Sequence, residues 1–199
     1  KFREIAYLIP SKYKKISPFS LKIPSPKETG KTFTSNSNLK ANFFSKFVNF
    51  PIISDDSGLC IKSLNNKPGI YSARLAKRHG SFFKAMNFIL KKMKNKKNRA
   101  ATFICSLSFK YPKKKPINVI GKIQGRISLK ILGKKGFGYD PIFIPDNQKK
   151  TFGQIAHLKK IKMDHRFLAL MKLKKKLKLC KLIFSNFINF QFLNYFLIF

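Results

Sequence analysis

The residues best suited to chemistry are two adjacent carboxylates, Asp55 and Asp56, in the stretch Ser54-Asp55-Asp56-Ser57-Gly58. The chain has only 7 acidic residues against 43 basic ones, and two of those seven lie side by side here. Neighbouring like charges repel one another unless a cation binds close to them. Because an apolar run precedes the pair, we expect a strand that ends at the aspartates and delivers them to a divalent cation.

A metal-dependent reaction on an anionic substrate needs further groups, and the loops before and after this stretch supply them. Mg²⁺ commonly takes one or two carboxylates together with substrate phosphates, and Glu28 is a second candidate ligand beside Asp56. Lys40 lies on a predicted helix just after the Glu28 loop, where it is suited to phosphate charge.

A nucleotide substrate would also need a surface for its base. Phe137 lies between two glycines, which leaves its ring face open for stacking. Asp140, His165 and Arg166 offer donors and acceptors for base edges. Each feature has an ordinary alternative: an Asp pair often forms a turn or helix cap, a loop Glu pairs with a surface lysine, and most Phe residues are core. Taken singly, each favours that alternative; the clustering of scarce acids in glycine-containing turns favours a site.

Composition limits the class of protein. A chain of 199 residues with 44% hydrophobic content is long enough for one globular domain, alone or with an appendage. The formal net charge of +36 indicates an anionic partner, such as nucleic acid, an anionic membrane or phosphorylated small molecules. Drift in an AT-rich genome is the competing explanation, since the chain is rich in Lys and Phe and has no Trp. Cys60, Cys105 and Cys180 are far apart, which predicts reduced thiols in a cytoplasmic protein.

Periodicity and turn residues predict alternating helices and strands, arranged as a mixed sheet. A helix over 1–9 ends at Pro10, and a second helix over 34–47 buries a stripe of Leu39, Phe43 and Phe47. A third helix begins at a Ser81 cap. Its expected buried face is Phe83, Met86, Leu90 and Met93. The expected strands are 50–54, 101–109, 117–123, 125–131 and 142–144, and a last helix starts at 164 and runs into 172–181.

The end of the chain differs in kind from the rest. Residues 182–199 carry no charge and are dominated by Phe, Leu, Ile and Asn. Their length falls just short of the roughly 20 residues of a membrane span, and their amides would be costly in lipid. We therefore expect a packing appendage or sequence beyond the domain end, and no membrane partner. The predicted division is a domain over 1–178 and an apolar tail over 179–199.

Four ordered motifs resemble the successive signatures of the non-canonical purine nucleoside triphosphate pyrophosphatases, the inosine triphosphate pyrophosphatase family. They are the stretches 54–59 (Ser-Asp-Asp-Ser-Gly-Leu), 67–74 (Lys-Pro-Gly-Ile-Tyr-Ser-Ala-Arg), 136–143 (Gly-Phe-Gly-Tyr-Asp-Pro-Ile-Phe) and 164–166 (Asp-His-Arg). The segment 28–41 and the glycines at 121 and 125 fit the family pattern as well. The resemblance covers roughly residues 1–175, and several spaced motifs in order are far more specific than any one of them.

The resemblance implies an elongated mixed α/β fold with two lobes around a central cleft, and an enzyme that is a homodimer. It implies Mg²⁺-dependent hydrolysis of ITP, dITP or XTP to the monophosphate and pyrophosphate. By similarity, Asp56 is the general base and a metal ligand, and Glu28 is its partner ligand. The implied substrate-binding residues are Lys1, Lys40, Ser57, Phe137, Gly138, Tyr139, Asp140, Lys160, His165 and Arg166.

Departures from the family pattern leave alternatives open. Lys1 matches the last residue of a phosphate loop whose preceding strand, Thr and Asn are not in this sequence, so we expect a truncated chain lacking the first strand. Ser35 stands where the family usually has Glu, and we expect weaker metal binding as a result. An inactive family member is thus one alternative. The other is a basic nucleic-acid-binding protein, although the chain lacks a recognition-helix motif and nucleic acid is not required for the predicted reaction.

Overall fold

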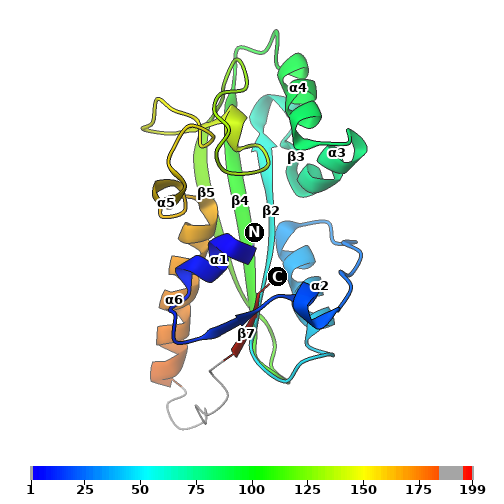
Figure 1. Cartoon of the computed structure of the whole chain (residues 1–199), viewed down its shortest axis with the longest axis vertical. Helices are drawn as coiled ribbons and strands as arrows, with labels where there is room; N and C mark the ends of the chain where they lie inside the picture. The colour runs from blue at the N-terminus through cyan, green and yellow to red at the C-terminus, as the bar shows by residue number, and fades with distance from the viewer. Residues whose placement is uncertain (1, 184–194, 199) are drawn as a thin grey trace. The chain divides into compact units, whose positions relative to one another are not determined.

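The computed structural model describes residues 2–183 and 195–198, which form a mixture of helices and strands (Figure 1). The helices are α1 (Phe2–Leu8), α2 (Phe33–Phe44), α3 (Ser72–Arg78), α4 (Phe82–Lys92), α5 (His157–Lys160) and α6 (His165–Ile183). The strands are β1 (Lys14–Ile16), β2 (Ile52–Ile61), β3 (Lys67–Pro68), β4 (Ala100–Lys110), β5 (Ile117–Ile127), β6 (Phe143–Pro145) and β7 (Tyr195–Ile198).

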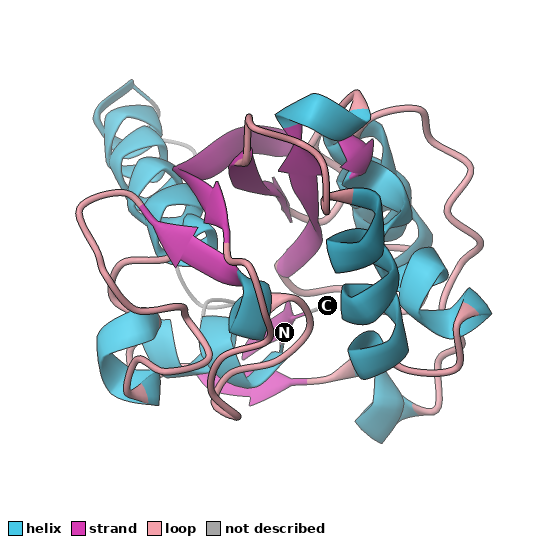
Figure 2. Cartoon of the chain, turned by 90° about the horizontal axis from the view of Figure 1, so that it is seen from above, coloured by secondary structure: helices cyan, strands magenta, loops and turns pink. Residues whose placement is uncertain are grey.

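The strands, drawn in magenta in Figure 2, belong to one mixed sheet. Their order is β1-β7-β2-β4-β5-β6, with β3 paired to β2. Strand β7 runs parallel to both β1 and β2, whereas β3 and β6 pair antiparallel with β2 and β5. Strands β4 and β5 are sheet neighbours that follow one another in sequence, as expected for the predicted hairpin. The predicted α/β fold with a mixed sheet is therefore confirmed.

The chain divides into two compact units, and each is described by itself. Unit 1 comprises residues 1–56, 105–121 and 166–199, and unit 2 comprises 57–104 and 122–165. The three long strands β2, β4 and β5 contribute residues to both units.

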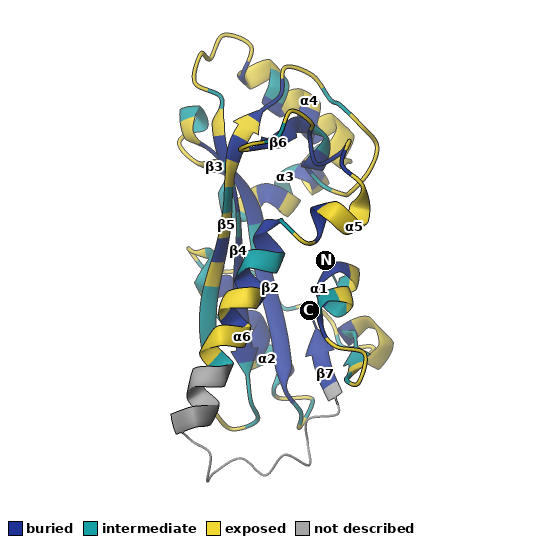
Figure 3. Ribbon diagram, turned by 90° about the vertical axis from the view of Figure 1, so that its left-hand side faces the viewer, coloured by how far each residue is buried: buried dark blue, intermediate teal, exposed yellow. Residues whose placement is uncertain are grey.

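The core of unit 1 lies on both faces of its strands, because adjacent residues of a strand point to opposite faces. Ile53 belongs to a cluster with residues of α1, β4 and α6, such as Ile5, Leu107 and Ala169. Ile52 belongs instead to a cluster with Phe44 of α2. Burial on both sides explains why β2 is dark almost throughout in Figure 3.

The core of unit 2 packs α3 and α4 with parts of β2, β4 and β5 and with the loops after residue 128. Its apolar residues include Leu59, Ile89, Phe103 and Phe143, all almost completely buried. On β4 the predicted strand and its apolar side are confirmed, since Phe103 here and Cys105, Leu107 and Phe109 in unit 1 are all buried. The intervening Ser106 and Ser108 are buried as well.

Two predicted helices have a different buried face from the one expected. Helix α2 buries Ser37, Lys40 and Ala41, whereas Phe47 lies beyond its end and is 53% exposed. The predicted stripe holds only in part: Phe43 packs against the cluster of Phe44 and Ile52, whereas the buried face of the helix also includes the polar residues Ser37 and Lys40. Helix α4 is capped by Ser81 as predicted, but Phe83 is 61% exposed and Ile89 is buried in its place. Helices α3 and α5 were not predicted, since each has two turns or fewer.

Two strand predictions were also wrong. The aspartates do not follow a strand that ends before them, because β2 continues through them to Ile61. Gly58 permits this continuation, since a Cβ there would lie 2.1 Å from the carbonyl oxygen of Gly69. The strands expected at 117–123 and 125–131 are a single strand, β5, that ends at Ile127.

The predicted apolar tail contributes the last strand of the sheet. Residues 184–194 lie outside the described residues, but Phe196, Leu197 and Ile198 are buried and pair with β1 and β2. The boundary at residue 178 stays a prediction. Among the residues that the structure describes, no helix has the length and apolar character needed to cross a membrane.

Candidate active site

Strand β2 directs Asp55 and Asp56 to opposite faces of the sheet, as the period of two requires. Asp56 shares its face with Ser54, whose hydroxyl donates to the Ser37 carbonyl of α2. Asp55 shares its face with Ile53 and approaches Arg166 of α6. Two adjacent carboxylates can both be buried in this way, because each finds its own cationic partner.

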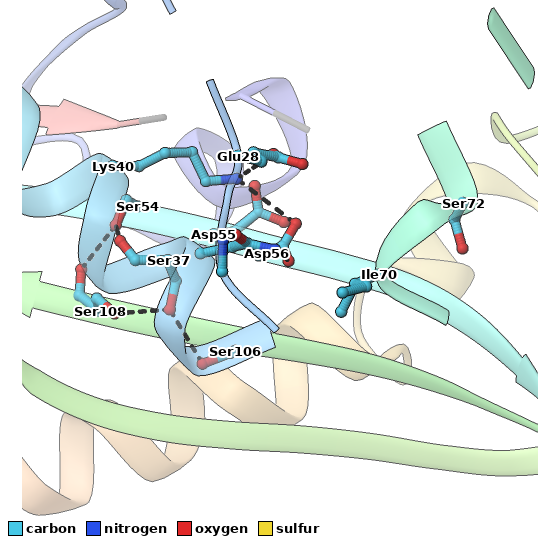
Figure 4. A network of polar contacts seen from close by, with 12 residues as sticks. Glu28, Ser37, Lys40, Ser54, Asp55, Asp56, Ile70, Ser72, Ser106 and Ser108 are labelled. Atoms are coloured by element: carbon cyan, nitrogen blue, oxygen red, sulfur yellow. Dashed lines mark hydrogen bonds and ion pairs between the residues drawn. The ribbon is translucent and has the colours of Figure 1, made fainter. Parts of the chain in front are cut away.

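The first group of interest is the acidic-lysine cluster of unit 1, which consists of Glu28, Asn36, Lys40 and Asp56. Figure 4 shows Glu28, Lys40 and Asp56 close together. Lys40 Nζ lies 3.0 Å from Glu28 Oε1 and 3.6 Å from Asp56 Oδ1. Lys40 is 1% exposed and Asp56 is 3% exposed, so these charges interact with little screening by water. The three predicted residues are therefore together in one cluster.

The charge state of Lys40 follows from its surroundings. Burial lowers the pKa of Lys40, but the carboxylates of Asp55, Asp56 and Glu28 outweigh it, so the net pKa is raised above the ordinary 10.5. The ammonium is therefore charged at neutral pH, as phosphate binding requires.

Asn36 holds this cluster together, although the sequence indicates it only as a member of the segment 28–41. Its Nδ2 donates to Asp56 Oδ2 at 3.1 Å, and its Oδ1 accepts from the Gly30 N–H at 2.8 Å. Asn36 is fully buried. It ties the Glu28 loop and Asp56 to the first turn of α2.

Ser35 has a structural role in this loop. Its hydroxyl accepts from the Thr32 N–H, while the Thr32 hydroxyl accepts from the Ser35 N–H, so the two form a capping box for α2. A capping box usually uses Glu or Gln at this position. The serine that replaces the family's usual Glu therefore retains the helix start.

Behind the cluster, buried hydroxyls join α2 to the sheet (Figure 4). Ser37 Oγ lies 3.1 Å from Ser106 Oγ and 2.7 Å from Ser108 Oγ, both on β4. These hydroxyls form hydrogen bonds with one another, so the polar face of α2 can be buried without leaving these groups unpaired.

Arg166 lies in a buried ion-pair group on the other face of β2. Its NH1 lies 3.1 Å from Glu4 Oε2 of α1, and its Nε lies 3.5 Å from Asp55 Oδ2. Each of the three side chains is at most 3% exposed. Glu4 was not among the predicted site residues, because its position on a short helix carries no motif signal.

The second group of interest is the aromatic-lysine cluster of unit 2, which consists of Phe137, Asp140, Phe152, Lys160 and Asp164. Lys160 Nζ lies 3.2 Å from Asp140 Oδ2 and 3.2 Å from Asp164 Oδ2. It also lies 5.1 Å from the ring centroid of Phe137 and 5.7 Å from that of Phe152. Phe137 is 38% exposed, whereas Lys160 is 1% exposed. Asp164 was read only as part of the last motif.

The turn that carries Phe137 is built by its glycines. Gly136 and Gly138 have φ angles of 73° and 67°, which side chains rarely adopt. A Cβ on Gly136 would meet Asp140 Oδ2 at 2.2 Å, so the carboxylate packs directly against the turn. Tyr139 is buried, its hydroxyl donates to the Ser72 carbonyl at 2.8 Å, and burial raises its pKa.

Three predicted residues remain to be placed. His165 is buried in unit 2 and its ring stacks on Phe103, with centroids 4.8 Å apart and planes 9° apart. Ser57 is half-buried on β2. Lys1 lies outside the described residues.

The donor set of the acidic-lysine cluster suits a hard cation. Among residues 2–183 and 195–198, no group of three or more His, Cys, Asp or Glu side chains gathers as a metal cluster. Two carboxylates converge on one cationic centre, the Lys40 ammonium. Carboxylate oxygens completed by substrate phosphates are the ligands that Mg²⁺ prefers, so Glu28 and Asp56 fit this metal.

Comparisons with known proteins match this arrangement to one family. The model of the Ham1 family matches residues 1–176. The chain is 40% identical over 182 residues to the dITP/XTP pyrophosphatase of Dictyoglomus thermophilum, covering 87% of each chain. It is 42% identical over 159 residues to the dITP/XTP pyrophosphatase of Clostridium perfringens, covering 76% of this chain and 78% of that protein.

Solved structures agree with the sequence matches. The HAM1 protein from Coxiella burnetii is similar with a TM-score of 0.81 at 30% identity, covering 89% of this chain and 92% of that one. The Staphylococcus aureus Ham1 protein is similar with a TM-score of 0.75 at 35% identity, covering 81% and 84%. The resemblance inferred from the motifs is confirmed, and the chain belongs to the Ham1 family.

Proposed function

We propose that the chain hydrolyses non-canonical purine nucleoside triphosphates, namely dITP, XTP and ITP, to the nucleoside monophosphate and pyrophosphate. The names of its relatives as dITP/XTP pyrophosphatases support this substrate class. The observation that carries the proposal is the convergence of the half-buried Glu28 and the buried Asp56 on the buried Lys40, in a chain that has few acids. This group combines metal-binding oxygens with a cation for phosphate.

Glu28 and Asp56 would hold Mg²⁺, which when bound supplies positive charge that neutralises the substrate phosphates. Asp56 accepts the proton from the water whose oxygen attacks the α-phosphorus. A new P–O bond forms, the bond from the α-phosphorus to the bridging oxygen breaks, and pyrophosphate leaves with that oxygen. Lys40 and Ser57 bind the phosphates, and Lys1 is proposed to do the same. Asn36 keeps Asp56 oriented through its amide.

Base recognition is assigned to the motif residues 137–140, Lys160, His165 and Arg166. Phe137 supplies an exposed ring for stacking, which is worth roughly 1–3 kcal/mol per base. His165 and Arg166 offer donors to a 6-keto oxygen. The 6-amino group of adenine would meet those donors with donors of its own, which leaves them unpaired and disfavours ATP.

The proposed function is tested by pyrophosphate release. Asp56→Asn keeps the size of the side chain but removes the charge and the proton acceptor, so we expect kcat with XTP or dITP to fall by about 10²–10⁴-fold. Asp146→Asn is the matched control, because it makes the same substitution at an exposed aspartate of the chain. Circular dichroism shows whether each variant is folded.

Two outcomes would contradict the proposal. Equal turnover of ATP and XTP by the unmodified chain would exclude the substrate specificity. Full activity in a folded Asp56→Asn variant would exclude the assigned base. Isothermal titration with Mg²⁺ and a nonhydrolysable triphosphate, compared between the unmodified chain and Glu28→Gln, tests the metal ligand separately.

The remaining predictions concern the setting of the enzyme. We propose that it acts as a homodimer on the cytoplasmic nucleotide pool. The thiols of Cys60 and Cys105 are buried, and a reducing compartment would keep such cysteines as thiols.

A further inference from the structure

Lys160 has surroundings that substrate binding does not explain. It is buried in unit 2 between two carboxylates, Asp140 and Asp164, at 3.2 Å from each. Buried lysines are rare unless they are paired, and a second carboxylate is more than pairing alone needs. The second partner, Asp164, is fully buried and has no assigned role.

The contacts of Asp140 lead from Lys160 to Phe137. Asp140 Oδ2 accepts from the Phe137 N–H at 2.9 Å, and the same oxygen pairs with Lys160. The absent Cβ of Gly136 leaves room for that oxygen against the turn. A displacement of Lys160 would therefore act on the backbone amide of Phe137.

Lys160 also acts on the Phe137 ring itself. Its ammonium lies 5.1 Å from the ring centroid, within the range of a cation–π contact. One surface of the ring is thus supported from inside unit 2, while the residue remains 38% exposed. Asp140 thus holds the backbone amide of Phe137, and Lys160, which pairs with Asp140, contacts the face of the Phe137 ring.

Asp164 determines where that ammonium lies. Lys160 ends α5, and Asp164 follows four residues later, immediately before α6. The Asp164 N–H donates to the Lys160 carbonyl at 3.1 Å, so backbone and side chain both join the two residues. Without the Asp164 carboxylate, the Lys160 ammonium loses one of the two carboxylates that lie 3.2 Å from it.

We propose that Asp164 is a positioning residue for base recognition: it anchors Lys160, and Lys160 with Asp140 fixes the Phe137 ring for stacking on the purine. The assignment rests on the proposed function only in taking the purine as the stacking partner. Because the proposed role of Asp164 concerns the base and not the phosphates, loss of its carboxylate changes KM and leaves kcat nearly unchanged.

A single-tryptophan reporter tests the positioning without catalysis. The chain contains no Trp, so Phe137→Trp creates one fluorophore at the ring in question. In that background we expect Asp164→Asn to raise the acrylamide quenching constant about twofold, since a released ring is more accessible. Asp164→Glu, which restores the carboxylate, is expected to return the constant most of the way, and Asp146→Asn is the control at an exposed aspartate of the same unit.

Steady-state kinetics with XTP provides the second readout. Asp164→Asn is expected to raise KM about tenfold with kcat changed less than about twofold, because a lost stacking platform weakens binding before chemistry. A KM that is unchanged or lowered would overturn the proposal, and a lowered KM would indicate that Asp164 restrains a Lys160 that contacts the base directly.

The outcomes separate this proposal from the proposed function. If the unmodified chain does not hydrolyse purine triphosphates, the proposed function fails, but the quenching series still tests whether Asp164 fixes the ring. If Asp164→Asn is unfolded by circular dichroism, Lys160→Met is used in its place, and it must raise quenching in the same way. Quenching equal to that of the Asp146→Asn control in every folded variant would overturn the positioning role.

Discussion

Six of the seven acidic residues make buried or half-buried ion pairs with Lys40, Lys160 or Arg166. Asp146 is the exception, and it is exposed. In a chain with a net charge of +36, the acidic residues therefore lie mainly beside these buried cations and not among the many basic residues of the surface. The grouping of the acidic residues around Lys40, Lys160 and Arg166 therefore marks the candidate functional residues.

Asn36 is predicted to matter as much for activity as for stability. Asn36→Ala removes the bond to the Asp56 carboxylate and the bond from Gly30, and a hydrogen bond to a charged group contributes about 1.5–3 kcal/mol. We expect kcat/KM for XTP to fall about tenfold or more. Asn42→Ala, at an exposed position of the same helix, is the control. Unchanged kcat/KM in folded Asn36→Ala would show that Asp56 needs no orienting partner.

The pairing of Lys40 predicts a pH dependence of stability. Its pKa in the folded chain is raised above the unfolded value, so the stabilisation is fully present below 10.5 and is lost as the pH rises through the raised pKa. Lys40→Met is thus expected to lower the free energy of unfolding by a constant amount from about pH 6 to about pH 9, and by less at higher pH. Urea denaturation across this range measures it.

A matched variant separates charge from shape at this position. Lys40→Arg keeps the charge at every pH tested and is expected to retain part of the stabilisation up to the alkaline limit. A Lys40→Met difference that grows with rising pH would contradict the sign of the shift.

At the scale of elements, some of the basic residues serve the sheet. Strand β5 pairs with β6 at Gly125–Ile127. Earlier in the same strand, two backbone carbonyls are contacted by lysines of α6. Lys172 Nζ donates to the Ile120 carbonyl at 2.9 Å, and Lys176 Nζ approaches the Asn118 carbonyl at 3.4 Å. Lysines that cover strand carbonyls discourage pairing with another chain. The exposed face of α6 is visible in Figure 3.

We predict that removing these lysines affects self-association more than stability. In Lys172→Ala/Lys176→Ala, the uncovered carbonyls are hydrated, so the free energy of unfolding falls by only about 1 kcal/mol. Light scattering at rising protein concentration is expected to show increased association compared with Lys175→Ala, an exposed lysine on the same helix. Equal scattering in the two variants would rule out a protective role.

The elements also show what the sequence could and could not predict. Strand β4, the start of α6 and the Ser81 cap were predicted correctly, because alternation and caps are local signals. The burial of α2 was not, since Ser37 and Lys40 are buried by serines of β4 and by carboxylates that are distant in sequence. The motifs pointed to Glu28, Lys40 and Asp56, which the structure brings together, whereas the contacts of Asn36 and Asp164 are revealed only by the fold.

At the scale of the whole molecule, the sheet depends on its last described strand. Leu197 is fully buried with Phe44 and Ile52, and its N–H donates to the Pro51 carbonyl at 3.0 Å. Leu197→Asp places an unpaired carboxylate in this core, so we expect the free energy of unfolding to fall by about 3 kcal/mol or more. Phe47→Asp, at a 53% exposed residue, is the control.

Urea denaturation of both variants measures this prediction. Equal stability of Leu197→Asp and the unmodified chain would mean that β7 contributes nothing to the sheet. The apolar composition of the tail indicated packing, but it could not predict a strand between β1 and β2, because parallel pairing with distant partners leaves no local signal.

The insertion of β7 between β1 and β2 has a consequence for synthesis on the ribosome. Strands β1 and β2 emerge early, yet the strand that joins them is among the last of the described residues to be made. Until then, each has an open edge that another nascent chain can join. We therefore expect a polypeptide that ends before residue 195 to associate with other chains more readily than one that carries β7.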